Sequence, residues 1–116
     1  MVVDNDRHRK ADLVFHALAD STRRDILSRS MRGENSVSTL ATFYPMSFAA
    51  VQKHVAILER AELVTKRRQG REQLVRGDLD ALHYARQLLQ QFETIWQGRV
   101  ERFGDIVNDN LRKGDS

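Results

Sequence analysis

Residues 36–60 decide the fold of this chain, and they read SVSTLATFYPMSFAAVQKHVAILER. Apolar residues recur at helical spacing on both sides of a single proline, Pro45. The earlier segment predicts a short helix whose buried stripe consists of Val37, Leu40, Ala41 and Phe43. The later segment predicts a helix over about 48–61 whose inward residues are Val51, Val55 and Leu58. Because a proline disfavours helical geometry in the residue before it, the two helices are joined by a tight turn.

Serine residues mark the start of both helices. Ser36 precedes the first helix and Ser47 precedes the second. A serine hydroxyl at this position accepts a hydrogen bond from a free backbone N–H of the first turn. Both helices therefore begin at a defined residue.

Two further helices are predicted on the N-terminal side. One begins near Lys10 and carries Ala11, Val14, Phe15 and Leu18 on its apolar face. The next covers about 21–31, with Asp20 as its N-cap and Gly33 just beyond its end.

The periodicity changes after residue 62. Residues 63–68 and 72–76 are short strand-like runs on either side of Gln69-Gly70-Arg71, which predicts a β-hairpin. Asp78 then caps a long helix over about 79–108. The order of elements is three helices, a tight turn, a helix, a hairpin and a long helix. This order predicts a mainly α fold with a small β-hairpin, the winged helix-turn-helix.

Composition sets the class of protein. The chain has 116 residues, of which 41% are hydrophobic and 30% charged, and it contains no cysteine. This predicts one globular domain over 10–108, with a flexible tail at 1–9 and a polar tail at 109–116. The absence of a long apolar run and of a signal sequence predicts a cytoplasmic protein without a membrane partner.

Three segments resemble the ArsR/SmtB-type winged helix-turn-helix transcriptional regulators. Residues 15–27 read FHALADSTRRDIL and resemble that family's ALADPTRRxIL signature. Residues 46–64 are similar to its recognition segment, and residues 67–71, RRQGR, to its RREGR hairpin turn. The resemblance implies a DNA-binding regulator, usually a repressor. The sequence contains no Gly-rich phosphate loop and no nucleophile motif, so we expect no enzymatic activity.

The chain departs from the metal-sensing members of that family. Those proteins carry a Cys-x-Cys pair or a set of carboxylates and histidines on the last helix, and this chain has no cysteine and no histidine pair. We therefore expect no metal and no cofactor. The sequence identifies no small-molecule effector.

The predicted DNA contacts begin on the helix at 48–61. A recognition helix places its N-terminal part against base edges in the major groove. Gln52 can bond to adenine and Lys53 to guanine or phosphate. Phe48 and Ala49 can pack on a thymine methyl group, although Phe48 can equally fix the helix to the core. Ser47 and His54 suit phosphate oxygens.

The hairpin supplies a basic strip. Five basic residues and one acid, Glu72, lie between Lys66 and Arg76. Such a strip in an otherwise balanced chain is typical of a nucleic-acid footprint. We predict contacts with the DNA backbone or the minor groove from Lys66, Arg67, Arg68, Arg71 and Gln73.

The long last helix carries more apolar surface than a small helix-turn-helix needs. We predict that it pairs with a second copy, together with the first helix, to form a homodimer. The predicted interface residues are Val14, Leu89, Phe92, Trp96 and Phe103. Two-fold symmetry then predicts a pseudopalindromic operator on double-stranded DNA.

Two alternatives stay open. The first is a metal-responsive repressor, because two pairs of residues are spaced so that each pair could supply two metal ligands from one helix face. These pairs are His83 with Asp80 and His16 with Asp20. A winged helix can also act as a protein-interaction module, since fold alone does not determine function.

Overall fold

The computed structural model describes the backbone of residues 5–114 and the side chains of Asp6 and residues 8–108. The chain divides into two compact units, one that ends at Ala85 and one that begins at Arg86. Residues 1–4 of the predicted N-terminal tail and residues 115–116 of the predicted polar tail lie outside the described residues.

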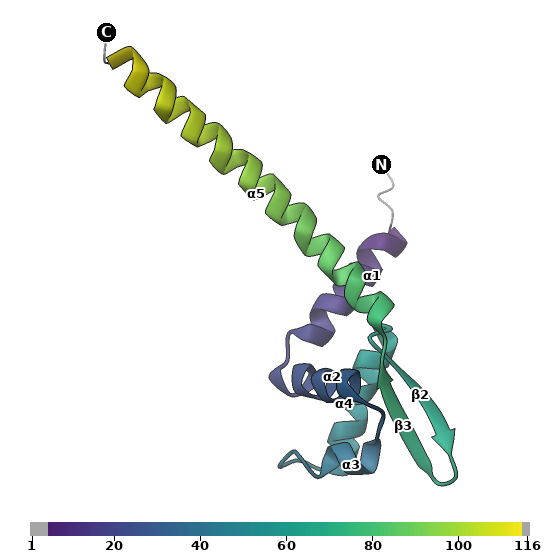
Figure 1. Cartoon of the computed structure of the whole chain (residues 1–116). Helices are drawn as coiled ribbons and strands as arrows, with labels where there is room; N and C mark the ends of the chain where they lie inside the picture. Colours follow the sequence, from purple (N-terminus) through teal and green to yellow (C-terminus); the bar gives the residue numbers. More distant parts are fainter. Residues whose placement is uncertain (1–4, 115–116) are drawn as a thin grey trace. The chain divides into compact units, whose positions relative to one another are not determined.

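The order of elements agrees with the predicted winged helix-turn-helix, with one short strand added. Figure 1 shows α2, α3 and α4 grouped together and the hairpin β2–β3 projecting beside them. The elements are α1 (Asn5–Leu18), α2 (Ser21–Arg32), β1 (Asn35–Ser36), α3 (Val37–Ala41), α4 (Phe48–Arg60), β2 (Val64–Gln69), β3 (Glu72–Gly77) and α5 (Leu79–Gly114).

The predicted caps of α2, α3, α4 and α5 are confirmed. Each capping side chain accepts a hydrogen bond from a backbone N–H of the first turn, which satisfies a group that has no partner within the helix. The acceptors are Asp20, Ser36, Ser47 and Asp78, at 2.9, 3.0, 3.1 and 2.9 Å from the nitrogens of Arg23, Thr39, Ala50 and Asp80.

The sheet has three antiparallel strands in the order β1-β3-β2. Strands β2 and β3 form the predicted hairpin, in register from Val64 opposite Gly77 to Gln69 opposite Glu72. Gly70 lies in the turn with a φ of 62°, a left-handed conformation that glycine adopts without a steric cost. We refer to β2, β3 and their turn as the wing.

One core fills the first unit. Side chains from α1 to α4, from the wing and from the first turns of α5 pack together in it. Those with no exposed surface include Val14, Ile26, Leu40, Val51, Leu58, Leu63 and Val75. The inward residues predicted for α4 are thus confirmed, and this packing fixes which face of α4 remains outside.

Helix α4 ends in a Schellman motif. The N–H of Leu63 donates to the carbonyl of Leu58 at 3.0 Å, and the N–H of Glu62 donates to that of Glu59 at 2.9 Å. Glu62 has a φ of 61°, so an L-residue with a side chain occupies the position that usually holds glycine. This places a local strain at the junction between α4 and the wing.

Gly77 marks a close approach between β3 and α2. A Cβ added at this position would collide with Sδ of Met31. Glycine therefore lets the base of the wing pack directly against α2.

The structure corrects three details of the prediction. Helix α1 begins at Asn5, not near Lys10, and an acid in its first turn, Asp6, favours this start. Helix α5 continues to Gly114 rather than ending at 108. Phe43 is not part of a buried stripe: α3 ends at Ala41, and Phe43 is 48% exposed with the Arg29 guanidinium 3.7 Å from its ring centre.

Candidate nucleic-acid interface

The outer face of α4 is the first part of the site. Val51, Val55 and Leu58 hold the opposite face in the core, so the helix cannot rotate without losing that packing. Gln52 and Lys53, the two residues predicted to read bases, are exposed. Ser47 and Ala49 are exposed at the N-terminal end of the same helix.

Phe48 lies at the start of this face. Its side chain is 46% exposed and it is not among the residues of the core. Nearly half of the surface of this residue is therefore available to a partner.

His54 is held from behind by Arg23, a residue that the sequence analysis does not single out. Arg23 is 8% exposed. Its guanidinium donates to the carbonyls of Ala17 and His16 at 2.9 Å each, and its third nitrogen lies 3.3 Å from Nδ1 of His54. Because a guanidinium can only donate, Nδ1 of a neutral His54 accepts in this contact, and such a ring carries its proton on Nε2. The contact therefore joins α2 to the recognition helix and leaves an N–H on the other side of the ring.

Asp20 completes this cluster. Its Oδ2 caps α2 and lies 3.9 Å from Nδ1 of His54. The hydrogen bond from the backbone N–H of Arg23 lowers the pKa of this carboxyl, and the charge of the Arg23 guanidinium lowers it further. A carboxylate engaged in this way has a structural function as a helix cap. Arg23 could have been suspected from sequence, since it occupies a core position at helical spacing from Ile26, Leu27 and Ser30.

The wing has two chemically different faces, because successive side chains of a strand point to opposite sides. Val64, Lys66 and Arg68 of β2 share one face, and the paired residues Val75 and Gln73 of β3 belong to it. Nζ of Lys66 lies 3.3 Å from Oε1 of Glu59 on α4, so this face continues from the recognition helix. Arg68 and Gln73 are exposed nearer the turn, and Arg71 is exposed beside Gly70.

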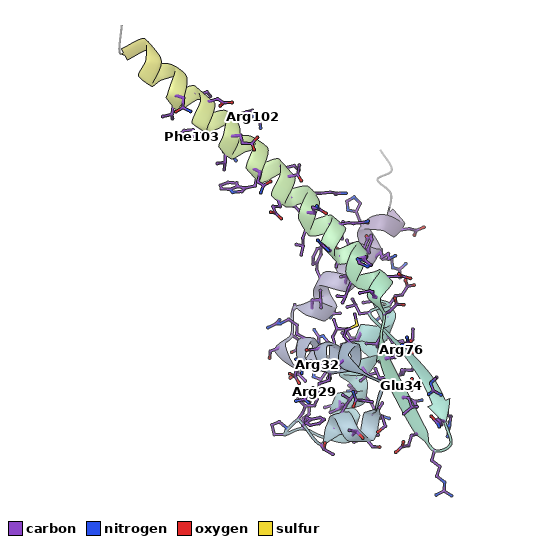
Figure 2. All side chains as sticks on the ribbon, viewed as in Figure 1. Arg29, Arg32, Glu34, Arg76, Arg102 and Phe103 are labelled. Carbon is purple, nitrogen blue, oxygen red and sulfur yellow. The ribbon has the colours of Figure 1, made fainter. Side chains whose placement is uncertain are left out.

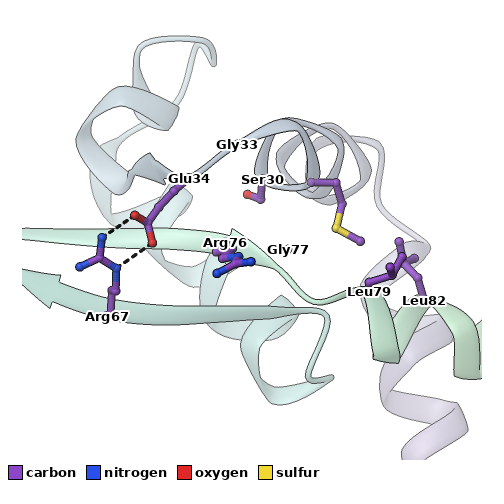
Figure 3. Close-up of a pocket in the computed structure, with 9 residues that line it drawn as sticks. Ser30, Gly33, Glu34, Arg67, Arg76, Gly77, Leu79 and Leu82 are labelled. Carbon is purple, nitrogen blue, oxygen red and sulfur yellow. Dashed lines mark hydrogen bonds and ion pairs between the residues drawn. The ribbon is translucent and has the colours of Figure 1, made fainter.

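Arg67 belongs to the other face of the wing. Its guanidinium forms two hydrogen bonds with the carboxylate of Glu34, at 2.6 and 2.9 Å (Figure 3). These bonds lower the pKa of Glu34 and raise that of Arg67. Of the five predicted wing contacts, the structure thus brings Lys66, Arg68, Arg71 and Gln73 to the α4 side or the turn, and Arg67 to the opposite side.

The second unit exposes a long apolar face of α5. Leu89, Phe92, Trp96 and Phe103 are 58%, 65%, 62% and 68% exposed. Phe103 stands out from the helix in Figure 2. Ile95, Val100, Ile106 and Val107 are exposed along the same helix. Four of the five predicted interface residues are therefore free to contact another surface.

Val14 is the exception. Its side chain is 0% exposed in a single chain and packs in the core. A residue with no remaining exposed surface has nothing to bury against a partner, so the prediction for Val14 is wrong.

Two negative findings concern the described residues. No group of three or more metal-ligating side chains gathers within them, so neither histidine–aspartate pair acquires a third ligand there. In the same part of the chain, no helix is long and apolar enough to cross a membrane.

Comparisons with known proteins identify the family. The chain is 37% identical over 101 residues to the HTH-type transcriptional regulator Rv2034 of Mycobacterium tuberculosis, which covers 87% of this chain and 92% of that protein. It is also similar to the structure of an ArsR-like transcriptional regulator from Rhodococcus sp. RHA1. The two match with a TM-score of 0.74 and 32% sequence identity, over 85% of this chain and 93% of that chain.

A third likeness concerns the fold alone. The homodimeric winged helix-turn-helix DNA-binding domain Mb0332 from Mycobacterium bovis matches with a TM-score of 0.65 at 24% identity, over 80% of this chain and 89% of that one. No protein-family model matches the chain. The sequence and structural relatives nevertheless agree with one another and with the wing and recognition helix described above. The chain belongs to the ArsR family of winged helix-turn-helix transcriptional regulators.

Proposed function

We propose that the protein binds double-stranded DNA in a sequence-specific manner as a homodimer and represses transcription. The observation that carries this proposal is the exposed polar face of a capped helix, α4, continued by a basic wing on the same compact unit. Helices placed in this way enter the major groove with their N-terminal residues against the bases.

Gln52 and Lys53 carry base recognition. The side-chain amide of Gln52 can donate to and accept from the edge of an adenine, and Lys53 can donate to guanine O6 and N7 or to a phosphate. Phe48 and Ala49 stand one turn earlier and offer apolar contact to a thymine methyl group. The packed inner face of α4 supports this assignment, because it limits the residues that can reach a groove.

Ser47 and His54 contact phosphates. The Arg23 contact leaves Nε2–H of His54 as the available donor, and an N–H is the group that a phosphate oxygen accepts from. Such contacts set the register of α4 on the duplex without reading sequence.

The wing binds the flanking backbone through Lys66, Arg68, Arg71 and Gln73. Arg67 lies on the other face of the wing and is held by Glu34, so it contacts a phosphate only if that ion pair opens. Lys and Arg contacts of this kind release counterions, so affinity falls steeply with salt.

The homodimer forms through the exposed face of α5. Burying Phe92, Trp96 and Phe103 against a second copy removes a large apolar surface from water, and aromatic residues dominate such interfaces. The related fold of Mb0332 is homodimeric, which supports the same arrangement here. Two recognition helices related by a two-fold axis read a pseudopalindrome with half-sites about 10–10.5 base pairs apart, and occupancy of a promoter by this dimer excludes polymerase. This function places the protein in the compartment that holds the DNA, the cytoplasm.

Selection of bound sequences from random duplexes, at two salt concentrations, tests the proposal. We expect an inverted repeat to be enriched, and affinity to fall on the order of 10³–10⁵-fold between 50 and 200 mM salt if 6–10 phosphates are contacted. Gln52→Ala should relax one position of each half-site at a cost of about 1–3 kcal/mol. Gln87→Ala, an exposed glutamine on α5, is the matched control and should bind as the wild type does. Affinity that is independent of both salt and sequence would contradict the proposal.

A further inference from the structure

A cavity of about 730 Å³ lies at the base of the wing, entirely within the first unit. The end of α2, the segment that follows it, both strands of the wing and the first turn of α5 line it (Figure 3). A volume of this size is typical of pockets for small organic ligands.

The charged part of the cavity has one positive charge without a carboxylate partner. Glu34 and Arg67 compensate each other through two hydrogen bonds. Arg76, on the neighbouring strand, forms no ion pair with any carboxylate of the described residues, although its charge helps to lower the pKa of Glu34 after the larger effect of Arg67. The lining therefore favours a ligand with a single negative charge, and Glu34 disfavours a second one.

The opposite part of the cavity is apolar. Met31, Leu79 and Leu82 line it, and Leu79 is 61% exposed although it begins a helix that packs against the core. A ligand with an apolar body would cover Leu79 while its charged end meets Arg76. This combination of an apolar wall and one convergent charge is characteristic of sites for amphipathic molecules.

The position of Arg76 argues against a function in DNA contact. Arg76 pairs with Thr65, so it shares a wing face with Arg67 and not with Lys66, which reaches α4. Its side chain is therefore on the side of the wing away from the recognition helix.

We propose that this cavity binds a small organic monocarboxylate with an aliphatic or aromatic body, and that its occupancy regulates DNA binding. The carboxylate is held by Arg76, and the body packs on Met31, Leu79 and Leu82. Only the regulatory half rests on the proposed function. The cavity is formed jointly by α2 and by both strands of the wing. A ligand that binds more tightly when the wing is in one position therefore changes the affinity of the protein for DNA. By linkage, DNA binding changes the affinity for the ligand by the same factor.

The first arm of the test measures ligand binding without DNA. Hexanoate and phenylacetate are titrated into the full chain and followed by methyl NMR, with hexanamide as the uncharged control and hexyl phosphate as the doubly charged one. We expect saturable shifts of the Met31, Leu79 and Leu82 methyl groups with the carboxylates, and much weaker binding of both controls. Shifts confined to α5 beyond Ala85, or equal binding of hexanamide, would overturn the proposal.

Arginine variants provide the matched comparison. Arg76→Gln should weaken carboxylate binding about tenfold, because it removes a charge-assisted hydrogen bond. Arg76→Lys should restore part of the affinity, and Arg60→Gln, an exposed arginine at the end of α4 outside the cavity, should leave it unchanged. Unchanged binding in a folded Arg76→Gln protein would overturn the assignment.

The second arm measures the affinity of the selected operator with and without saturating carboxylate. The wild type should show a change that Arg76→Gln loses, while both bind DNA equally without ligand. If the carboxylate binds but DNA affinity is constant, the regulatory half is wrong. If no DNA is bound at all, the proposed function fails, and the first arm still decides whether the cavity is a carboxylate site.

Discussion

The two units of this chain use apolar side chains of the same helical spacing in opposite ways. In the unit that ends at Ala85, Ile26, Leu40 and Leu58 are 0% exposed. In the unit that begins at Arg86, Phe92 and Trp96 are 65% and 62% exposed. The first unit therefore buries its apolar side chains within one chain, whereas the second leaves its apolar side chains exposed and able to pack against another surface. Exposure in the folded chain, and not periodicity, distinguishes a core stripe from an interface stripe.

The largest expected effect comes from charging the exposed stripe. Phe92→Asp combined with Trp96→Asp should produce a monomer and lower operator affinity by about 10²–10⁴-fold, because the second half-site loses its effective concentration. Sedimentation velocity and operator titration measure the two effects. Thr94→Asp, on the opposite side of α5, is the control and should remain a DNA-binding dimer. If both variants had the same mass and the same operator affinity, the exposed stripe of α5 would not be an interface, and this difference between the units would be wrong.

A core substitution tests the other half of the comparison. Leu58→Ala should lower the free energy of unfolding by about 2–5 kcal/mol, since Leu58 has no exposed surface and leaves a cavity. Denaturant unfolding measures this loss. Self-association at low denaturant should be retained, because Leu58 lies outside α5. A loss of less than 1 kcal/mol, roughly the effect of a surface site, would show that the core around α4 is not closed.

A smaller effect is expected where α4 joins the wing. Glu62→Gly should raise the free energy of unfolding by up to about 1 kcal/mol. The left-handed conformation costs a non-glycine residue about 1–2 kcal/mol, and glycine avoids this cost. Part of the gain is lost because glycine is more flexible in the unfolded chain. Ala56→Gly, within α4, provides a control of opposite sign and should cost about 1 kcal/mol. If Glu62→Gly destabilises as much as Ala56→Gly does, the strain is absent.

The smallest effect is a pH dependence within the first unit. Burial, and then the 2.6 Å hydrogen bond to Asp25, raise the pKa of Tyr44 from 10.0 to about 12. The neutral phenol thus contributes stability that is fully present below pH 10 and is lost as the pH rises through about 12.

Absorbance titration of a Tyr84→Phe protein, in which Tyr44 is the remaining tyrosine, measures this pKa. Asp25→Asn should lower the midpoint, and circular dichroism shows whether the chain is still folded. A midpoint near 10 in the folded protein would contradict the environment described for Tyr44.

Much of the first unit could be predicted from sequence because its signals are local. Asp20, Ser36, Ser47 and Asp78 cap helices within two or three residues of their own positions, and the wing is closed by its own turn. The resemblance to the ArsR family, carried by residues 15–27, 46–64 and 67–71, is confirmed by the relatives.

The remainder depends on contacts between distant segments. Strand β1 has two residues and exists only through its pairing with β3, so it carries no periodic signal. The helical spacing places Val14 on an apolar face, but spacing alone does not show whether the core of the same chain or a second copy covers that face. The bonds of Arg67 with Glu34, and of Arg23 with two carbonyls at the end of α1, likewise join residues whose spacing in the sequence carries no pattern. Which predicted residues touch DNA stays a prediction.

Sedimentation equilibrium of the full chain, alone and with one equivalent of operator duplex, measures whether two chains associate and bind DNA together. We expect twice the chain mass at micromolar concentration, and two chains on each duplex in the complex. A single chain under both conditions would contradict it, because the exposed face of α5 would then have no partner and the two recognition helices would not be joined.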